Sequence, residues 1–430
     1  MAKDSVAREG AAAEIETEVL IVGGGMVGLT LACTLAGAGV PVVVLERRAL
    51  ADTVEDAFDG RASAIAQGSR QALEAAGLWA GMAAQAQPIL DIRVSDGQLG
   101  DAGLWQGAAP LFLHYDHREV GGLPLGYIVE NRVIRLALNA ALAERPALSV
   151  LAPAALEDLD RGPAGVEARL ADGRRIRAQV AVGAEGRRSR LRAEAGIRCA
   201  EWSYPQTGIV CTIAHEEPHN GVAHEHFLPA GPFAVLPMVD DDRGRHRSSI
   251  VWTERRDLVE AMLALDDAAF SAEMQRRFGD SLGRIRLLGR RWSYPLSLLH
   301  AERYVDRRLA LVGDAAHGIH PIAGQGLNLG LRDVAALAAT LVDARRLGLD
   351  LGGGPVLARY QRWRRFDNVV LTLVTDGLNR LFSNDIGPLR LARDLGLAAV
   401  GRIAPLKRLL MRHAMGLEGD LPRLIRGQPL

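Results

Sequence analysis

The feature that most constrains how this chain can fold is a glycine loop near its N-terminus, Gly23-x-Gly25-x-x-Gly28. A short apolar run, Val19 to Val22, leads into the loop, and the spacing of apolar residues from Met26 to Ala36 is typical of a helix. Val40 to Leu45 then predicts a second strand. In a β-α-β unit of this kind the three glycines serve a tight turn, the close approach of a pyrophosphate and the packing of helix on strand. The sequence therefore predicts a dinucleotide-binding unit at the start of the chain.

The residue after the second predicted strand, Glu46, narrows the choice of nucleotide. An acidic side chain at this place accepts hydrogen bonds from the ribose hydroxyls of an adenosine, and it disfavours a 2′-phosphate. FAD and NAD fit this pattern, whereas NADP does not. The N-terminal unit by itself leaves the choice between FAD and NAD open.

A second group of motifs, about 290 residues further along the chain, favours FAD. A predicted strand, Leu309 to Val312, ends at Gly313-Asp314, and Pro321-x-x-Gly324-x-Gly326-x-Asn328 follows. An aspartate at a strand end can hold the ribitol hydroxyls of FAD. The glycines allow the N-terminus of a helix to approach closely, and the positive end of the helix dipole can stabilise negative charge on a reduced flavin.

The rest of the chain predicts further sheets and a helical end. Runs from Val166 to Val182 flank the turn signal Asp172-Gly173, and β-branched and aromatic runs between Trp202 and Thr253 suggest a separate sheet for the substrate. Helix formers dominate after Gly324, with Gly352 to Pro355 as a linker. We predict an α/β fold, in which a Rossmann-like FAD-binding domain is interleaved with a β-sheet substrate domain and followed by a helical C-terminal region. The predicted ranges are a flexible arm (1–16), three parts of the FAD-binding domain (17–85, 126–198 and 297–345), two parts of the substrate domain (86–125 and 199–296) and the helical region (346–430).

Composition and charge exclude several classes of function. Acidic and basic side chains number 51 each, so no net field attracts the protein to nucleic acid. The three cysteines, Cys33, Cys199 and Cys211, lie far apart without a CxxC pair, which argues against a disulfide scaffold or a zinc site. Neither a signal peptide nor an apolar run of about 18 residues, the length that spans a membrane, is visible. We expect a cytoplasmic protein that is soluble or peripheral at the inner face of the membrane.

Three stretches carry a resemblance to a known family: Asp59-Gly-Arg-Ala-Ser-Ala-Ile65, Gly313-Asp-Ala-Ala-His317, and His320-Pro-Ile-Ala-Gly-Gln-Gly-Leu-Asn-Leu-Gly-Leu-Arg-Asp333. With them, nearly the whole chain resembles the single-component FAD-dependent aromatic hydroxylases of the para-hydroxybenzoate hydroxylase fold. Within that superfamily the chain is most similar to the ubiquinone-biosynthesis hydroxylases. Pro405-Leu-Lys and Ala414-Met-Gly-Leu, near the C-terminus, are also similar to that branch.

The resemblance implies roles for individual residues. Arg61 would contact the flavin, Asn131 and Arg132 would lie near the ribityl chain and pyrophosphate, and Asp314 would hold ribitol. The edge of the flavin ring would lie against the stretch from Gly324 to Asn328. We predict His320, Pro321 and Gly324 as the catalytic edge beside the ring. The predicted cofactor-binding residues are Gly23, Gly25, Gly28, Glu46, Arg61, Asn131, Arg132, Glu185, Asp314, Gly326, Leu327 and Asn328.

One motif departs from the family pattern. The family's middle motif normally reads Asp-Gly, whereas this chain has Glu185-Gly186. Glutamate keeps the charge and lengthens the arm. Because that motif serves both flavin and nicotinamide in the family, the departure leaves nicotinamide handling open and does not affect the FAD assignment. Ser189, in the same stretch, is typical of a helix cap rather than of a nucleophile.

Two histidine pairs, His317 with His320 and His224 with His226, could be drawn as metal ligands. No cysteine or carboxylate spacing completes a known site around either pair, so we predict no metal. The sequence also lacks the motifs of serine hydrolases and of phosphate-cradling P-loops.

The resemblance implies the reaction as well. With NAD(P)H as co-substrate, FAD would form a C4a-hydroperoxide with dioxygen and hydroxylate the ring of a (poly)prenylated phenol in ubiquinone biosynthesis, in a pocket that excludes water. Two alternatives stay open: a flavin reductase or dehydrogenase of the same fold, and a non-catalytic assembly protein that keeps FAD as a structural cofactor. The predicted partners are the phenolic substrate, a membrane surface and other ubiquinone-biosynthesis proteins, with no nucleic acid.

The tail after about Ile386 is locally basic, and Gly401 and Pro405 divide it into two predicted helices. A basic amphipathic helix can lie at an anionic membrane surface, where a prenylated substrate would dissolve. Helices that pack on the flavin domain fit the pattern equally well. The apolar residues at helical spacing are Leu391, Leu395, Ala399, Ile403, Leu406 and Leu410.

Overall fold

The first glycine loop belongs to a six-stranded sheet. In this computed structural model, which describes residues 14–54, 60–96, 112–319, 324–382 and 400–430, the strand order is β19-β20-β13-β2-β3-β9. The five strands from β20 to β9 run parallel, and β19 is antiparallel at the edge. Every residue of β2, β3 and β13 is buried, which explains their continuous apolar sequences. The strands are β2 (Val19–Val22), β3 (Val42–Leu45), β9 (Leu148–Leu151), β13 (Val180–Gly183), β19 (Val305–Asp306) and β20 (Leu309–Leu311).

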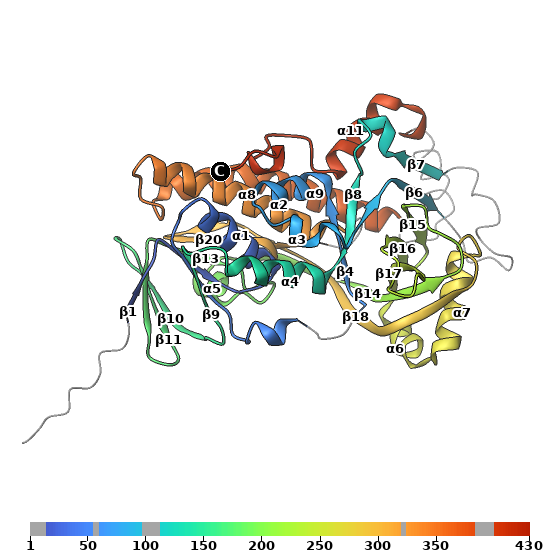
Figure 1. Ribbon diagram of the computed structural model, residues 1–430, viewed down its shortest axis with the longest axis horizontal. Coiled ribbons are helices and arrows are strands. Elements are labelled where there is room, and N and C mark those ends of the chain that lie inside the picture. The colour runs from blue at the N-terminus through green and yellow to red at the C-terminus, as the bar shows by residue number, and fades with distance from the viewer. Residues whose placement is uncertain (1–13, 55–59, 97–111, 320–323, 383–399) are drawn as a thin grey trace, which may run out of the picture.

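Three long helices accompany this sheet. α1 (Met26–Gly37) contacts both α4 (Asn131–Leu142) and α8 (Gln325–Arg346). Together with the strands they enclose the largest hydrophobic cluster, to which α8 contributes a buried, alanine-rich surface. Figure 1 shows this part of the molecule on the left of the view. The shorter helices and turns are η1 (Ala51–Thr53), α2 (Gln67–Ala75), α3 (Ala80–Ala83), η2 (His117–Val120), α5 (Arg190–Glu194), η3 (Gly313–Ala315) and η5 (Leu424–Arg426).

A second, eight-stranded sheet lies on the right of Figure 1. Its order is β21-β18-β14-β17-β16-β15-β6-β7. One face packs on α6 (Arg256–Ala264) and α7 (Asp267–Phe278) through an aromatic core that includes Phe233, Trp252 and Phe270. The strands are β6 (Asp91–Asp96), β7 (Phe112–Asp116), β14 (Cys199–His215), β15 (Val222–Leu228), β16 (Gly231–Met238), β17 (His246–Arg255), β18 (Ile285–Ala301) and β21 (His317–Gly318).

Two smaller sheets complete the described part of the chain. The three-stranded sheet has the order β4-β8-β5 and joins the two large sheets through apolar side chains. The four-stranded sheet has the order β1-β12-β11-β10. The strands are β4 (Ala62–Ala66), β5 (Ala86–Ile89) and β8 (Gly126–Glu130) in the first, and β1 (Glu14–Glu16), β10 (Leu156–Arg161), β11 (Val166–Leu170) and β12 (Arg175–Ala178) in the second.

The predicted fold class is confirmed, and the structure corrects some of its details. The last three residues of the predicted flexible arm form β1, because Ile15 pairs with Ile176 and packs on the main core. Residues 1–13 of that arm lie outside the described residues. The run that ends at Gly183 is two strands, β12 and β13, which join different sheets. The proposed domain boundary at residue 296 falls within β18, which continues to Ala301.

The C-terminal region is helical where the structure describes it. α9 (Gly354–Phe382) packs against α8, and α11 (Ala404–Ala414) begins with Pro405 in its first turn. The interruption before α11 falls at Ile403, between the two predicted breaking points Gly401 and Pro405. Among the described helices, none is long and apolar enough to cross a bilayer.

Candidate functional site

The first glycine loop is shaped by two close backbone approaches. Gly23 has a φ of +113°, and a Cβ at this position would lie 2.4 Å from the carbonyl oxygen of Ala184. A Cβ on Gly28 would lie 2.0 Å from the oxygen of Gly23. Both glycines are therefore required by the packing of β2, α1 and the segment after β13, as the motif predicts.

Gly25 is different, because in the part of the chain that the structure describes no atom lies within 4 Å of a Cβ placed on it. Its φ of −73° is open to any residue, and it stands at the N-cap of α1. Neither packing nor backbone conformation requires a glycine here. The free space at a helix N-terminus, where unpaired N–H groups point outward, fits the pyrophosphate of a dinucleotide.

Glu46 lies directly beside this loop. Its Oε2 accepts a hydrogen bond of 2.8 Å from the N–H of Gly24, and its Oε1 accepts one of 3.0 Å from the N–H of Arg48. These bonds hold the carboxylate at the carboxyl ends of β2 and β3. The position suits an acceptor for adenosine ribose hydroxyls.

The second glycine motif meets the first across the sheet. β20 lies next to β13, and β13 lies next to β2. Gly313 has a φ of +59°. The side chain of Val27 on α1 fits against Gly313 and against Gly330 of α8, because neither glycine has a Cβ. The Asp314 side chain follows the end of β20 and is 51 % exposed, so its carboxylate is accessible to a ligand.

The start of α8 repeats the pattern of α1. Gly324 adopts the left-handed conformation at the N-cap, and a Cβ there would lie 2.8 Å from the Cβ of Ala64 on β4. Gly326 lies in the first turn, and no atom of the described residues lies within 4 Å of the place that its Cβ would occupy. Leu327 packs on the main core. The two glycines that face open space, Gly25 and Gly326, thus lie at the N-termini of the two helices that the sequence assigns to the pyrophosphate and the flavin ring.

Asn328 has a structural role that the sequence did not predict. Its Oδ1 accepts a hydrogen bond from the N–H of Ala66 at 2.8 Å, and its Nδ2 donates to the oxygens of Ala64 and Gly324 at 2.9 and 3.0 Å. The amide is 1 % exposed and fully engaged with backbone. It ties β4 to the start of α8 and so holds both elements at the site.

The strand β4 also brings Arg61 and α4 together. The N–H of Asn131 donates to the oxygen of Arg61 at 3.0 Å, and the hydroxyl of Ser63 donates to Oδ1 of Asn131 at 2.6 Å. Arg132 follows in the first turn of α4. The guanidinium of Arg61 lies 4.5 Å from the centre of the Trp292 ring on β18. Trp292 was not predicted, because only the register of β18 against β14 turns it toward β4.

Glu185, predicted to bind cofactor, directs its carboxylate to α5. It accepts hydrogen bonds from the Ser189 hydroxyl at 2.6 Å and from the N–H groups of Leu191 and Arg190 at 3.1 and 3.3 Å. Ser189 in turn accepts a bond from the N–H of Arg192, so the predicted helix cap is confirmed. The longer arm of glutamate lets it cap α5, and any contact with flavin or nicotinamide stays a prediction.

Two arginines that follow Glu185 reach the second motif. Arg187 lies 3.7 Å from the carboxylate of Asp314 and also donates to the hydroxyl and carbonyl oxygens of Ser297. Arg192 donates to the oxygen of Ala315 at 3.0 Å. The sequence did not predict these contacts, and the dense run of arginines from residue 187 to 192 is the only signal that could have indicated them. They place positive charge beside the predicted ribitol position.

Beneath Gly313 lies a buried ionic network. Asp333 on α8 contacts Nε2 of His317 at 2.5 Å, accepts from Nε of Arg364 on α9 at 2.9 Å, and accepts from the N–H of Gly313 at 3.0 Å. Burial alone would raise the pKa of Asp333, but the charges of His317 and Arg364 outweigh it and lower the pKa to about 2. The network anchors the Gly313 to His317 loop to both helices.

The predicted residues His320 and Pro321 lie outside the described residues. A metal site at the histidines is not supported by geometry, since His317 is engaged by Asp333, and His226 contacts the Ser95 hydroxyl at 2.9 Å through Nδ1. Within the described ranges, no group of three or more His, Cys, Asp and Glu side chains is arranged to hold a metal.

Comparisons with known proteins agree with this geometry. A family model described as FAD binding domain matches residues 16–350. The chain is 54 % identical over 416 residues to the ubiquinone hydroxylase UbiL of Rhodospirillum rubrum, which covers 96 % of this chain and 93 % of that protein. It is 38 % identical to the 3-demethoxyubiquinol 3-hydroxylase of Escherichia coli over 93 % of this chain and 99 % of that protein. The crystal structure of p-nitrophenol 4-monooxygenase PnpA from Pseudomonas putida has the same fold, with a TM-score of 0.75 at 22 % identity over 95 % of this chain and 99 % of that one.

Proposed function

The chain belongs to the FAD-dependent aromatic hydroxylases, in the branch of the ubiquinone-biosynthesis hydroxylases, and from this we propose that it hydroxylates the ring of a prenylated phenol. The observation that carries the proposal is the pair of helix N-termini at Gly25 and Gly326, where no described residue packs against the glycine and space is left for a ligand. We take dioxygen as the oxygen source and NAD(P)H as the reductant.

Bound FAD would supply the redox chemistry that activates dioxygen. The chain's own residues would bind FAD, orient the substrate and shield the reacting ring from water. The first turn of α8 presents unpaired N–H groups and the positive end of its dipole at Gly326, where they would stabilise negative charge. An apolar cluster between the three-stranded and the eight-stranded sheets, including Ile89, Ile128 and Met238, would keep water from the reacting ring.

Substrate-dependent oxygen uptake tests this proposal against its alternatives. Flavin-loaded protein with NADH or NADPH is expected to consume oxygen faster when a short-prenyl phenol is added. A flavin reductase or dehydrogenase would oxidise NAD(P)H without using oxygen to modify the phenol. A non-catalytic assembly protein would oxidise neither nicotinamide with any phenol.

We also propose that α9 rests on an anionic membrane surface, where a prenylated substrate would be held. One face of α9 exposes Phe366 (74 %), Leu373 (64 %) and Leu381 (39 %), which lie at helical spacing. The opposite face is buried through Tyr360 and Arg364. An exposed apolar face of this kind on an amphipathic helix fits the interfacial layer of a bilayer.

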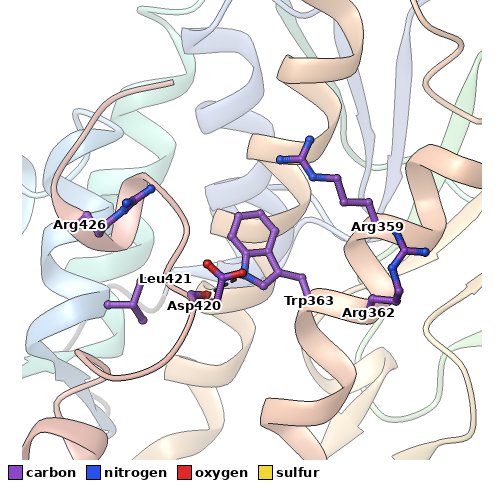
Figure 2. A pocket seen from close by; sticks show the side chains of 6 residues that line it. All are labelled: Arg359, Arg362, Trp363, Asp420, Leu421 and Arg426. Carbon is purple, nitrogen blue, oxygen red and sulfur yellow. Dashed lines mark hydrogen bonds between the residues drawn. The ribbon is translucent and has the colours of Figure 1, made fainter.

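The same face of α9 begins with a basic pocket of about 450 Å³. Figure 2 shows its lining, to which α9 contributes Arg359, Arg362 and Trp363, and the C-terminal segment contributes Asp420, Leu421 and Arg426. The indole N–H of Trp363 donates to the backbone oxygen of Asp420 at 2.7 Å and joins the two walls. Arg359 also lies 3.2 Å from the Asp343 carboxylate, so the three guanidinium groups face two carboxylates in all, and this positive balance favours the phosphate of a lipid headgroup.

α11 offers a second such face. Ile403, Leu406, Leu409 and Leu410 are 38 to 52 % exposed, whereas Lys407 and Met411 are buried, with Lys407 bonded to Glu119. The apolar residues that we predicted at Leu391, Leu395 and Ala399 lie outside the described residues. We also propose that these same exposed faces bind other ubiquinone-biosynthesis proteins.

Liposome binding tests the membrane proposal. Phe366→Ser with Leu373→Ser is expected to weaken binding to vesicles of phosphatidylcholine and phosphatidylglycerol by tenfold or more, because about 1.5 to 3 kcal/mol is lost for each apolar side chain that would be buried. Leu347→Ser is the matched control, since Leu347 is 73 % exposed but lies at the end of α8. Equal binding by all three proteins would contradict the proposal.

A further inference from the structure

A carboxylic acid lies on the face of the eight-stranded sheet that is turned toward the flavin domain. Side chains alternate along β15, and His224 points to the α7 side, where its ring is 5.4 Å from that of Phe278. Ala223 packs on the other side, in the apolar cluster with Met238 and Ile128. Glu225, two residues after Ala223, therefore shares the face of Ala223.

The strand register supports this placement. Glu225 pairs with Ala234 on β16, while the neighbouring residue Val235 belongs to the core on the α7 side. Thr212 on β14 lies on the face of Glu225, because its hydroxyl donates to the oxygen of Gly60 at 3.2 Å and contacts the sulfur of Met238. This face of the sheet therefore packs against the segment that contains Arg61 and β4.

The same contacts relate Glu225 to the flavin edge. Ala62 and Ala64 of β4 pack on the apolar cluster that contains Ala223. Ala64 also contacts the N-cap of α8, where a Cβ on Gly324 would lie 2.8 Å from it. β4 therefore contacts both Glu225's face of the sheet and the start of the helix that would meet the flavin ring.

Glu225 has no structural task in the described parts of the chain, where no hydrogen bond or ion pair engages its carboxylate. Its side chain is only partly buried, yet burial within the surrounding protein raises the pKa of Glu225 to about 7, well above the ordinary value of 4.5. A carboxyl that is sheltered from water without a hydrogen-bond partner costs the fold stability, and such groups are found most often where they act on a ligand.

We propose that Glu225 is a catalytic residue that accepts the proton of the substrate's ring hydroxyl. The inference rests on the proposed function, and it supplies the phenol-activating group that the sequence did not reveal. As the distal oxygen of the activated dioxygen bonds to a ring carbon, its O–O bond would break and the bonding electron pair would leave with the other oxygen. At the same time an electron pair of the ring hydroxyl oxygen moves into the ring, and the hydroxyl proton passes to the Glu225 carboxylate. The proton of the attacked carbon then passes to the oxygen that left, which ends as water, and Glu225 returns its proton to the ring oxygen, which restores an aromatic phenol with one more hydroxyl.

Glu225→Gln tests the catalytic part, because it keeps the shape and removes the base. The rate of product formation is expected to fall at least about 100-fold, the usual contribution of a general base. Glu201→Gln is the matched control, since Glu201 is an exposed residue of the same sheet, and it is expected to match wild type. An unchanged rate in Glu225→Gln would overturn the inference.

Binding without turnover tests the contact itself. The dissociation constants of a short-prenyl phenol and of its methyl ether are compared through the change in flavin absorbance, for the wild-type protein and for Glu225→Leu. Wild type is expected to prefer the phenol about tenfold or more, and Glu225→Leu is expected to lose that preference. No preference in wild type would overturn the inference even if Glu225→Leu does not fold. A wild-type protein that neither binds nor hydroxylates any phenol would contradict the proposed function instead.

Discussion

Replacing Gly326 by alanine adds one methyl group at the position where we predict the flavin ring. Among the described residues, none has an atom within 4 Å of the new Cβ, and the position is in the first turn of α8 with no backbone strain. The apo-protein is therefore expected to keep its fold. Its free energy of unfolding is expected to rise by up to about 1 kcal/mol, because alanine favours the helix over glycine.

Binding of FAD is expected to change in the opposite direction. A methyl group forced into a filled contact costs about 1 to 3 kcal/mol, which corresponds to a dissociation constant about 5 to 150 times larger. Gly326→Val should weaken FAD binding further. A variant that is as stable as wild type and yet releases its flavin would show that the glycine serves the ligand and not the fold.

The assay pairs two measurements on flavin-free protein. Urea unfolding followed by circular dichroism gives the stability, and titration with FAD followed by flavin fluorescence gives the dissociation constant. Gly330→Ala, four residues further along α8, is the matched control, since its Cβ would lie 2.7 Å from a methyl carbon of Val27. That variant is expected to lose stability. If Gly326→Ala bound FAD as tightly as wild type, the argument from open space would be refuted.

Three further predictions concern polar groups that are buried, Asp333 and Asn328, or partly buried, Glu225. Asp333→Asn is expected to lower the free energy of unfolding at neutral pH by about 3 kcal/mol, because it removes the one fully buried carboxylate that pairs with the buried guanidinium of Arg364 in the described residues. Since the pKa of Asp333 is lowered to about 2 from 3.8, its contribution is present above pH 3.8 and is lost as the pH falls through 2, which an acid titration of both proteins checks. Asn328→Leu is expected to destabilise the fold by about 1 to 3 kcal/mol in urea unfolding, because Ala66 and Ala64 lose buried hydrogen bonds; equal midpoints would contradict its tying role. The pKa of Glu225 is raised to about 7, so wild type has its full contribution below pH 4.5 and loses it as the pH rises through 7. Glu225→Gln should then be more stable than wild type at pH 8 by up to about 3 kcal/mol, and a stability gap independent of pH would contradict the shift.

The two glycine motifs and the fold class could be predicted because local rules decide them. A glycine loop between a strand and a helix has one main use, and the spacing of apolar residues locates both elements. The family that these motifs predicted is confirmed by the family match and by the relatives. The sequence could also assign Ser189 to a helix cap, since the cap depends only on its neighbours in the chain.

Other parts depend on contacts between distant segments, which a single sequence does not contain. The sequence predicted a flexible arm where β1 lies, because the pairing of Ile15 with Ile176 on β12 joins segments about 160 residues apart. Asn328 stood in a cofactor motif, but its amide is used by the backbone of β4, more than 250 residues away. The role of Glu225 could not be predicted, because it depends on the strand register that turns the side chain toward β4. It also depends on the lack of a hydrogen-bond partner among the described residues.

The most direct test of the central claim is the fate of molecular oxygen. Purified, flavin-loaded protein is supplied with NADH or NADPH, a short-prenyl phenol and oxygen gas labelled with the heavy isotope, and the product is weighed by mass spectrometry. We predict a product that carries one labelled oxygen atom on its ring, with the other oxygen atom reduced to water. Reduction of the labelled oxygen to hydrogen peroxide or water alone, at the expense of the nicotinamide and with the phenol unchanged under both nicotinamides, would contradict the hydroxylase function.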